Sequence, residues 1–244
     1  MRCQPQYEGQ VYICLKNVQL CLLCNEPADA QTPLCMACET DLPWLGDQCL
    51  TCALPLLAPG MTCGGCLHEP PAFEQVAVPW VYGFPVDSLI TRFKHSANWP
   101  FGHLLAEVLG QFLQHRFEED LPRPHALLPV PLATKRLRQR GFNQASMLAR
   151  WLGQHLDLPC EENLLQRILD TSAQQDLDAK ARQLNLRNAF VLTPDAQVAG
   201  RHLALVDDVL TTGATAQALA RLLIDAGAAR VDVYCLARTP KPGT

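Results

Sequence analysis

Two adjacent carboxylates precede a short run of small and hydroxyl-bearing residues in the stretch 203–215. Asp207 and Asp208 follow the apolar residues 203–206, and the run that comes next is Thr211, Thr212, Gly213, Ala214 and Thr215. Adjacent carboxylates can accept hydrogen bonds from vicinal hydroxyls or hold Mg²⁺ through water. A loop of small residues before a helix offers backbone N–H groups to an anion. Ribose 5-phosphate carries both a diol for the acid pair and a phosphate for the loop, so it fits both parts of the motif.

The elements around this stretch predict where its side chains lie. The near-continuous apolar run 203–206 is typical of a parallel strand covered on both faces, and we expect a helix to begin at about Ala216. In an open α/β sheet the carboxyl ends of the strands face the ligand crevice, so the acids and the loop are expected there. The alternative is a plain strand-to-helix turn with a solvated acid pair, which the mutual repulsion of abutting acids disfavours.

A second chemical pattern is a set of eight cysteines in four identical pairs. Each pair reads C-x₂-C and ten residues separate successive pairs: Cys21, Cys24, Cys35, Cys38, Cys49, Cys52, Cys63 and Cys66. Two such pairs make one tetrahedral Cys₄ site, so the pattern predicts two structural Zn²⁺ ions with no open coordination position. The uniform spacing leaves sequential, interleaved and nested pairing open, and we take sequential pairing as the default.

Disulfides are the alternative for these cysteines, and they require an oxidising compartment. The apolar patch 11–23 is interrupted by polar residues and has no basic segment before it, so it does not read as a signal peptide. We therefore expect metal-bound thiolates in a cytoplasmic protein. No stretch approaches a membrane-spanning length, so membrane insertion is not expected.

Charge is distributed unevenly between two parts of the chain. Residues 1–70 carry two basic and seven acidic side chains, a balance of −5, whereas residues 71–244 carry 18 basic and 17 acidic ones. Two Zn(Cys⁻)₄ centres would add about −2 each. Such a surface repels phosphate backbones, so the cysteine module is predicted to be structural or to contact proteins.

A local cluster of cations lies in residues 135–140. Lys135, Arg136, Arg138 and Arg140 follow an apolar run, 125–131, that reads as another strand. Arginine forks can bind pyrophosphate with two parallel hydrogen bonds, so this segment is a candidate pyrophosphate clamp. The alternative is a solvated helix face.

These motifs together resemble the competence protein F (ComF) family, which includes GntX-type proteins. The resemblance rests on the cysteine pairs, Phe93-Lys94, Pro129-Val130-Pro131, the RGFNQ run 140–144 and VDDVLTTGAT at 206–215, which looks like the phosphoribosyl-pyrophosphate (PRPP) motif of type I phosphoribosyltransferases. It implies that Asp207 and Asp208 hold the ribose hydroxyls of Mg²⁺-bound PRPP and that residues 211–215 bind the 5′-phosphate. It further implies pyrophosphate or flexible-loop roles for Arg136, Arg140, Asn143, Gln174, Arg182 and Asn185.

The remaining chain predicts an alternation of strands and helices. We expect a strand over 76–84, helices over 86–95, 101–117 and 143–155, and a late strand around 231–235. The polar segment 170–188 is long enough to cover a site and exclude water, as the mobile loop of the resembled enzymes does. A plain surface loop is the alternative.

We therefore predict a type I phosphoribosyltransferase-like α/β domain over 71–244, joined to a double zinc-ribbon module over 1–70. Few residues follow the last predicted strand, so acceptor recognition is expected from 72–124, which shows no aromatic cage. Two hypotheses follow: an enzyme that transfers phosphoribose, or a non-catalytic factor that binds PRPP and single-stranded DNA. The resemblance implies a role in DNA uptake and natural transformation. In either case DNA contact is expected through 135–140, and contact with DNA-uptake proteins through the zinc module.

Overall fold

The computed structural model describes residues 19–28, 32–96, 98–169 and 188–241. Contacts divide the chain into two compact units, Met1–Thr40 and Asp41–Thr244. The division falls between the second and third cysteine pairs, and the domain boundary at 70/71 stays a prediction. Among the described helices, none combines the length and the apolarity needed to cross a lipid bilayer.

The larger unit is built on a parallel sheet in the order β1-β7-β6-β3. Its strands are β1 (Val76–Ala77), β3 (Ala126–Pro129), β6 (His202–Leu210) and β7 (Arg230–Arg238), and β2 (Trp80–Val81) also pairs with β7. Strands β6 and β7 are buried along almost their whole length. Most residues of both strands are apolar, because helices cover both faces of the sheet.

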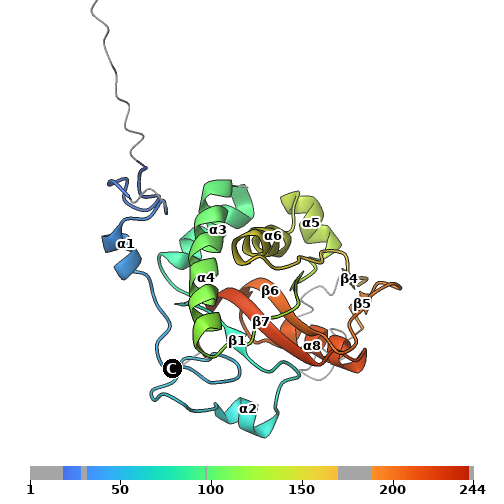
Figure 1. The fold of residues 1–244 in the computed structure, drawn as a ribbon. Coiled ribbons are helices and arrows are strands. Elements are labelled where there is room, and N and C mark those ends of the chain that lie inside the picture. Colours follow the sequence, from blue (N-terminus) through green and yellow to red (C-terminus); the bar gives the residue numbers. More distant parts are fainter. Residues whose placement is uncertain (1–18, 29–31, 97, 170–187, 242–244) are drawn as a thin grey trace, which may run out of the picture. The chain divides into compact units, whose positions relative to one another are not determined.

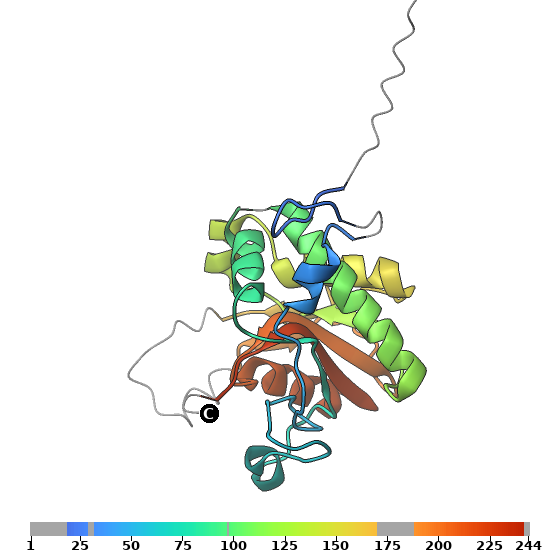
Figure 2. The ribbon, with the colours of Figure 1, turned by 90° about the vertical axis from the view of Figure 1, so that its left-hand side faces the viewer.

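Two helical layers enclose this sheet (Figures 1 and 2). On one face lie α4 (Trp99–Glu119) and α6 (Gln144–Leu156), with α3 (Val86–Ser96) packed on α4. The opposite face is covered by α8 (Ala214–Asp225), which packs against β6 and β7. The apolar stripe of α8, including Leu219 and Leu223, is fully buried in this core. The predicted α/β architecture with a parallel sheet flanked by helices is confirmed.

The segment between the cysteine region and α3 differs from its prediction. The single strand expected over 76–84 is two short strands, β1 and β2, because Pro79 lies between them and cannot donate to a ladder. Residues 134–140 form a short helix, α5 (Thr134–Arg140), which agrees with the alternative interpretation of the basic segment as a helix face. A separate antiparallel pair, β4 (Leu165–Arg167) with β5 (Phe190–Leu192), was not predicted.

The third and fourth cysteine pairs belong to the larger unit. Leu45 N–H donates to the carbonyl of Pro79, Val81 N–H donates to that of Pro43, and the rings of Trp44 and Trp80 lie 5.7 Å apart. The short helix α2 (Gly64–His68) lies inside this segment. The described part of the smaller unit contains the helix α1 (Met36–Thr40).

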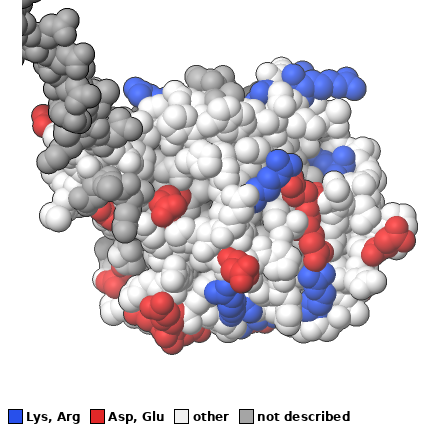
Figure 3. All heavy atoms as spheres, turned by 45° about the horizontal axis from the view of Figure 1, so that its top comes forward, with Lys and Arg blue, Asp and Glu red and all other residues white. Residues whose placement is uncertain are grey.

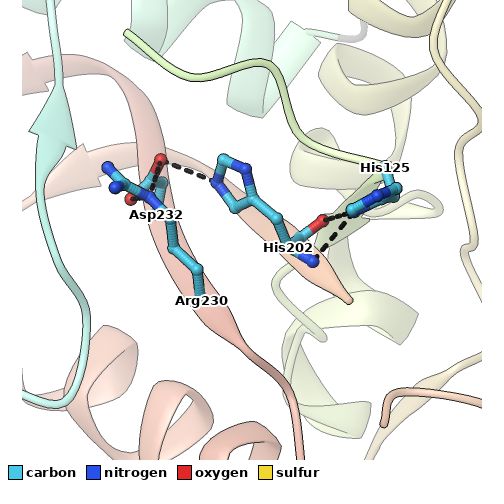
Figure 4. A network of polar contacts seen from close by, with 4 residues as sticks. All are labelled: His125, His202, Arg230 and Asp232. Atoms are coloured by element: carbon cyan, nitrogen blue, oxygen red, sulfur yellow. Dashed lines mark hydrogen bonds and ion pairs between the residues drawn. The ribbon is translucent and has the colours of Figure 1, made fainter. Parts of the chain in front are cut away.

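The amino end of the sheet is held by a buried polar network (Figure 4). Asp232 is completely buried, and its carboxylate faces His202 Nε2 at 2.8 Å and accepts from Arg230 Nε at 3.1 Å. The backbone N–H of His202 donates to His125 Nδ1 at 2.9 Å. These contacts link β6, β7 and the start of β3 at the amino ends of the strands, away from the acid pair. The network therefore stabilises the sheet and takes no part in the site.

Candidate functional site

The acid pair lies near the carboxyl end of β6, beyond the last residue that β3 pairs. Strand β3 pairs with β6 as far as Val206, so Asp207 and Asp208 have no β3 partner. Asp208 is 5% exposed, and its carboxylate Oδ2 forms an ion pair with the ammonium of Lys94 on α3. Asp207 accepts a hydrogen bond from the Asp208 backbone N–H at 2.9 Å. Lys94 therefore belongs to the acid site, and only the Phe93-Lys94 motif hinted at this in the sequence.

Burial raises the pKa of an acid in this site and lowers the pKa of a base, so both values move toward 7. Desolvation raises the pKa of Asp207 to about 7, although the charges of Lys94 and Arg140 oppose the shift. Desolvation likewise lowers the pKa of Lys94 to about 8, with Asp207 opposing and the charges of Arg140 and Arg136 reinforcing it. A carboxylic acid with a pKa of about 7 and an amine with a pKa of about 8 are typical of functional sites rather than of solvated surface pairs.

The predicted phosphate loop follows β6 directly. Gly213 has φ of +78°, a left-handed conformation that favours glycine, and α8 begins at Ala214. Thr212 Oγ1 accepts from the Ala214 N–H at 3.3 Å. Thr211, Thr212 and Ala214 are exposed, so N–H groups of the loop can reach a ligand. The acids and the loop thus lie at one end of the sheet, on one strand.

The basic segment approaches the same site through its last residue. Arg140 donates to Gln144 Oε1 at 2.8 Å, and desolvation followed by the charge of Arg136 lowers its pKa, while Asp207 opposes the shift. Lys135, Arg136 and Arg138 are exposed on α5. Arg140 and Arg136 therefore stand within electrostatic range of the acids and Lys94.

Asn143 has a structural role in the fold. Its side-chain carbonyl caps α6 by accepting from the Ala145 N–H at 3.1 Å, and its amide donates to the carbonyl of Val130 at 3.0 Å. It thereby ties the turn after β3 to the start of α6. A ligand contact by Asn143 stays a prediction. Gln174, Arg182 and Asn185 lie outside the described residues.

An aromatic cluster lies beside the site, where no aromatic cage was expected. Phe93 precedes Lys94, and its ring is 5.6 Å from that of Phe142 and 5.8 Å from that of Trp151. Trp99 packs on Phe142 at 5.1 Å and remains 40% exposed. The cluster draws on segments far apart in sequence, which explains why no local pattern revealed it. It packs Phe93 of α3 against Phe142 of the RGFNQ turn.

The eight cysteines gather into two groups by sequential pairing. One group is Cys21, Cys24, Cys35 and Cys38, the other is Cys49, Cys52, Cys63 and Cys66, and within each the sulfur atoms all lie within 4.8 Å of one another. The default pairing is therefore the one the structure shows. A Cys₄ set at this spacing fits a tetrahedral structural Zn²⁺.

Backbone donors favour the thiolate at one cysteine of each group, Cys21 and Cys49, while burial raises the pKa of Cys38 and Cys66. Burial opposes ionisation of Cys21, yet backbone N–H groups of Cys35, Cys24 and Leu23 lower its pKa to about 6. Burial likewise opposes ionisation of Cys49, and backbone groups of Cys52, Cys63 and Thr51 lower its pKa to about 7. The Cys63 N–H donates to Cys49 Sγ at 3.2 Å. N–H groups aimed at sulfur stabilise the thiolate that Zn²⁺ requires.

Comparison with known proteins agrees with this site. Residues 139–243 match the family model described as phosphoribosyl transferase domain. The DNA utilization protein YhgH of Salmonella typhi is 36% identical over 222 residues, which are 90% of this chain and 97% of that protein. The competence protein F of Haemophilus influenzae is 34% identical over 211 residues (86% and 92%). The competence protein ComFC of Bacillus subtilis is 28% identical over 218 residues (84% of each).

The predicted resemblance is thus matched by relatives aligned over most of their length. The family model spans the acid pair and the loop before α8. On these grounds the chain belongs to the competence protein F (ComF) family and carries a type I phosphoribosyltransferase-like fold.

Proposed function

We propose that this protein binds Mg²⁺·PRPP and transfers its phosphoribosyl group to an acceptor during the use of DNA. The observation that carries the proposal is the convergence of Asp207, Asp208 and Lys94 beside the loop 211–215, on one strand and its neighbouring helix. The names of the relatives, DNA utilization protein and competence protein F, support the biological setting.

Each group has a role that its chemistry allows. The acids accept hydrogen bonds from the 2′- and 3′-hydroxyls and hold the Mg²⁺ that accompanies PRPP, and N–H groups of the loop bind the 5′-phosphate. Lys94, Arg136 and Arg140 neutralise the pyrophosphate. When the anomeric carbon–oxygen bond breaks, pyrophosphate leaves with the electron pair, and a lone pair of the acceptor forms the new bond at that carbon. Cations near the leaving group stabilise its developing charge.

Binding requires the ion pair between Lys94 and Asp208 to exchange partners. A buried carboxylate that loses its counter-charge is costly, so the hydroxyls or the Mg²⁺ must replace Lys94 at Asp208. The ammonium, once released, is positioned to meet the pyrophosphate. The pair thus keeps the acids neutralised until a ligand with both a cation and an anion arrives.

The first experiment measures binding and turnover together. Calorimetry should show that PRPP binds with Mg²⁺ and not with EDTA, and that Asp207→Asn with Asp208→Asn removes binding. Thr212→Val should weaken it by a contact worth about 1 kcal/mol. Unchanged affinity in the double variant would refute the ribose assignment. Pyrophosphate release that depends on an added acceptor, scanned over nucleobases and single-stranded DNA, would identify an enzyme; binding without release would favour a non-catalytic PRPP-binding factor.

Single-stranded DNA is a second ligand that the exposed cations of α5 favour. Figure 3 shows basic and acidic side chains interspersed over the visible face without one broad basic field. The short helix α5 carries three exposed cations, Lys135, Arg136 and Arg138, and the partly buried Arg140. We therefore expect DNA to contact the protein at this helix alone. Affinity for an oligonucleotide should fall as salt rises, with a slope set by a few released counterions.

The DNA experiment can be turned directly against this assignment. Arg136→Ala with Arg140→Ala should weaken DNA binding, and PRPP should compete because it needs the same arginines. The acidic cysteine segment should contribute little. DNA binding that survives the arginine variant, or that disappears when residues 1–40 are removed while the rest stays folded, would overturn it.

A further inference from the structure

The second cysteine group (Cys49, Cys52, Cys63 and Cys66) is built into the same core as the phosphate loop. Ala53, which follows Cys52, is completely buried and belongs to the core cluster that contains Leu210, Ala216 and Leu219. Cys52 packs partly against that cluster. The turn that carries two of the four sulfur ligands therefore shares its apolar core with the end of β6 and the first turn of α8.

Arg238 joins this turn to the loop by hydrogen bonds. The side chain comes from the end of β7, where Arg238 is in register with Leu210, and the residue is only 6% exposed. Its Nε donates to the carbonyl of Cys52 at 2.9 Å, and its Nη1 donates to that of Leu210 at 3.0 Å and to that of Thr211. A third Nη1 bond, at 2.8 Å, goes to the carbonyl of Thr239. One rigid guanidinium thus holds a metal-ligand residue and the two residues that enter the loop.

The contact with Thr211 fixes an atom that the phosphate needs. The carbonyl of Thr211 and the N–H of Thr212 share one planar trans peptide and point in opposite directions. Because the carbonyl is held toward Arg238, the Thr212 N–H is turned away from it, toward the exposed side of the loop. Orienting donors before the ligand arrives lowers the entropy cost of binding.

A cavity of about 280 Å³ separates other parts of the cysteine group from the loop. Its lining includes Cys52, Cys63 and Cys66 from the cysteine group and Thr212 and Gly213 from the loop, together with Arg238. Hydrogen bonds of Arg238 join the Cys52 turn to Leu210 and Thr211.

We propose that the second cysteine group and Arg238 form a latch that sets the affinity of the loop for a 5′-phosphate. Arg238 is a positioning residue: it acts through the Thr211 peptide and does not touch the ligand. A metal-filled group holds the Cys52 carbonyl in place, the carbonyl holds Arg238, and Arg238 holds the loop. The proposal rests on the assignment of 211–215 as the phosphate loop. The first cysteine group, in the unit Met1–Thr40, has no part in it.

The two groups supply matched variants. Cys52→Ser removes one sulfur ligand and keeps the carbonyl, and Cys24→Ser does the same in the first group. Each should lose one Zn²⁺ per chain. With ribose 5-phosphate as the calorimetric probe, Cys52→Ser should weaken binding at least about tenfold, since it loosens a charge-assisted network, and Cys24→Ser should not. Equal losses in both variants, or unchanged affinity after Cys52→Ser has lost its ion, would overturn the latch.

A measurement without ligand separates this proposal from the phosphoribosyl assignment. Hydrogen exchange at the amides 211–214 should quicken in Cys52→Ser, and in wild-type protein stripped of metal, and not in Cys24→Ser. If wild-type protein binds no ribose 5-phosphate, the proposed function fails while this measurement still decides the latch. Unchanged exchange at 211–214 in metal-free protein would refute it. The wild-type arm also serves if Cys52→Ser does not fold.

Arg238 itself is tested with its charge kept. Arg238→Lys retains a cation that cannot reach the spread of carbonyls with directed donors, so both Zn²⁺ ions should stay bound while the 5′-phosphate affinity falls. Arg238→Gln should fall further. A purely structural role predicts lower thermal stability with unchanged affinity of the molecules that remain folded, and that result would contradict the latch.

Discussion

Asp207→Asn is expected to abolish most PRPP binding and, at the same time, to make the fold more stable at pH 8. The carboxyl has a pKa of about 7 in the folded protein against 3.8 in its ordinary state, so the folded state binds more protons between these values. Stability of the wild-type protein therefore falls as pH rises from about 4 to 7, and the penalty persists above pH 7. Asparagine carries no charge and can still accept from the Asp208 N–H. The gain is at most about 4 kcal/mol.

Urea unfolding at pH 5.5 and pH 8 checks this claim, with Asp208→Asn as the matched control. Asp208 is the ion-pair partner of Lys94, so its replacement removes that partner from a largely buried ammonium and should destabilise the protein. We expect the stabilisation by Asp207→Asn to be larger at pH 8 than at pH 5.5. Calorimetry at pH 6 and 7.5 adds the functional side: wild-type affinity for Mg²⁺·PRPP should rise as Asp207 ionises. Equal stability of Asp207→Asn and wild type at pH 8 would show that the carboxyl is not strained.

Purified reduced protein is expected to hold two Zn²⁺ ions per chain, and their removal should unfold the cysteine segments. Structural zinc in small Cys₄ or mixed sites contributes on the order of 10 kcal/mol of binding free energy to folding. The turn at Ala53 is the point where this loss reaches the α/β core. We expect circular dichroism to show that most of the helical signal, to which α4 and α6 contribute, survives chelation. The midpoint of thermal unfolding should be lower.

Metal analysis of single variants makes the zinc prediction sharp. Cys49→Ser should retain one ion, because the two groups share no ligand. Cys160→Ser is a suitable control, since Cys160 belongs to neither group and should leave both ions bound. A stoichiometry of one ion in the wild type, or loss of both from Cys49→Ser, would contradict two independent centres.

The sequence predicted those features that rest on local patterns. Strands β6 and β7, helices α3, α4 and α6 and the acid–loop order follow from apolar runs and from side-chain types next to one another. The fixed cysteine spacing was likewise visible in the chain. Strands β4 and β5 were missed because each has three residues, too few to show an alternation.

The contacts that complete the site depend on tertiary structure and could not be predicted. The ion pair between Lys94 and Asp208 joins α3 to β6, and the sequence offered only the Phe93-Lys94 motif as a sign of it. Arg238 was not singled out because its acceptors are backbone carbonyls, and a carbonyl leaves no trace in residue type. The carbonyl of Cys52 is 186 positions away from Arg238 along the chain.

The pairing of β1 with β7 determines when the sheet can be completed during folding. Val76 lies opposite Val233, so two residues more than 150 positions apart must meet before the edge of the sheet closes. Contacts of such long range slow folding, because chain entropy is lost before the strands gain anything. On the ribosome, the apolar strands made first must wait for β7, exposed to aggregation, while the cysteine groups can already bind metal. Zinc supply and chaperone capacity during synthesis should therefore limit the yield of folded protein.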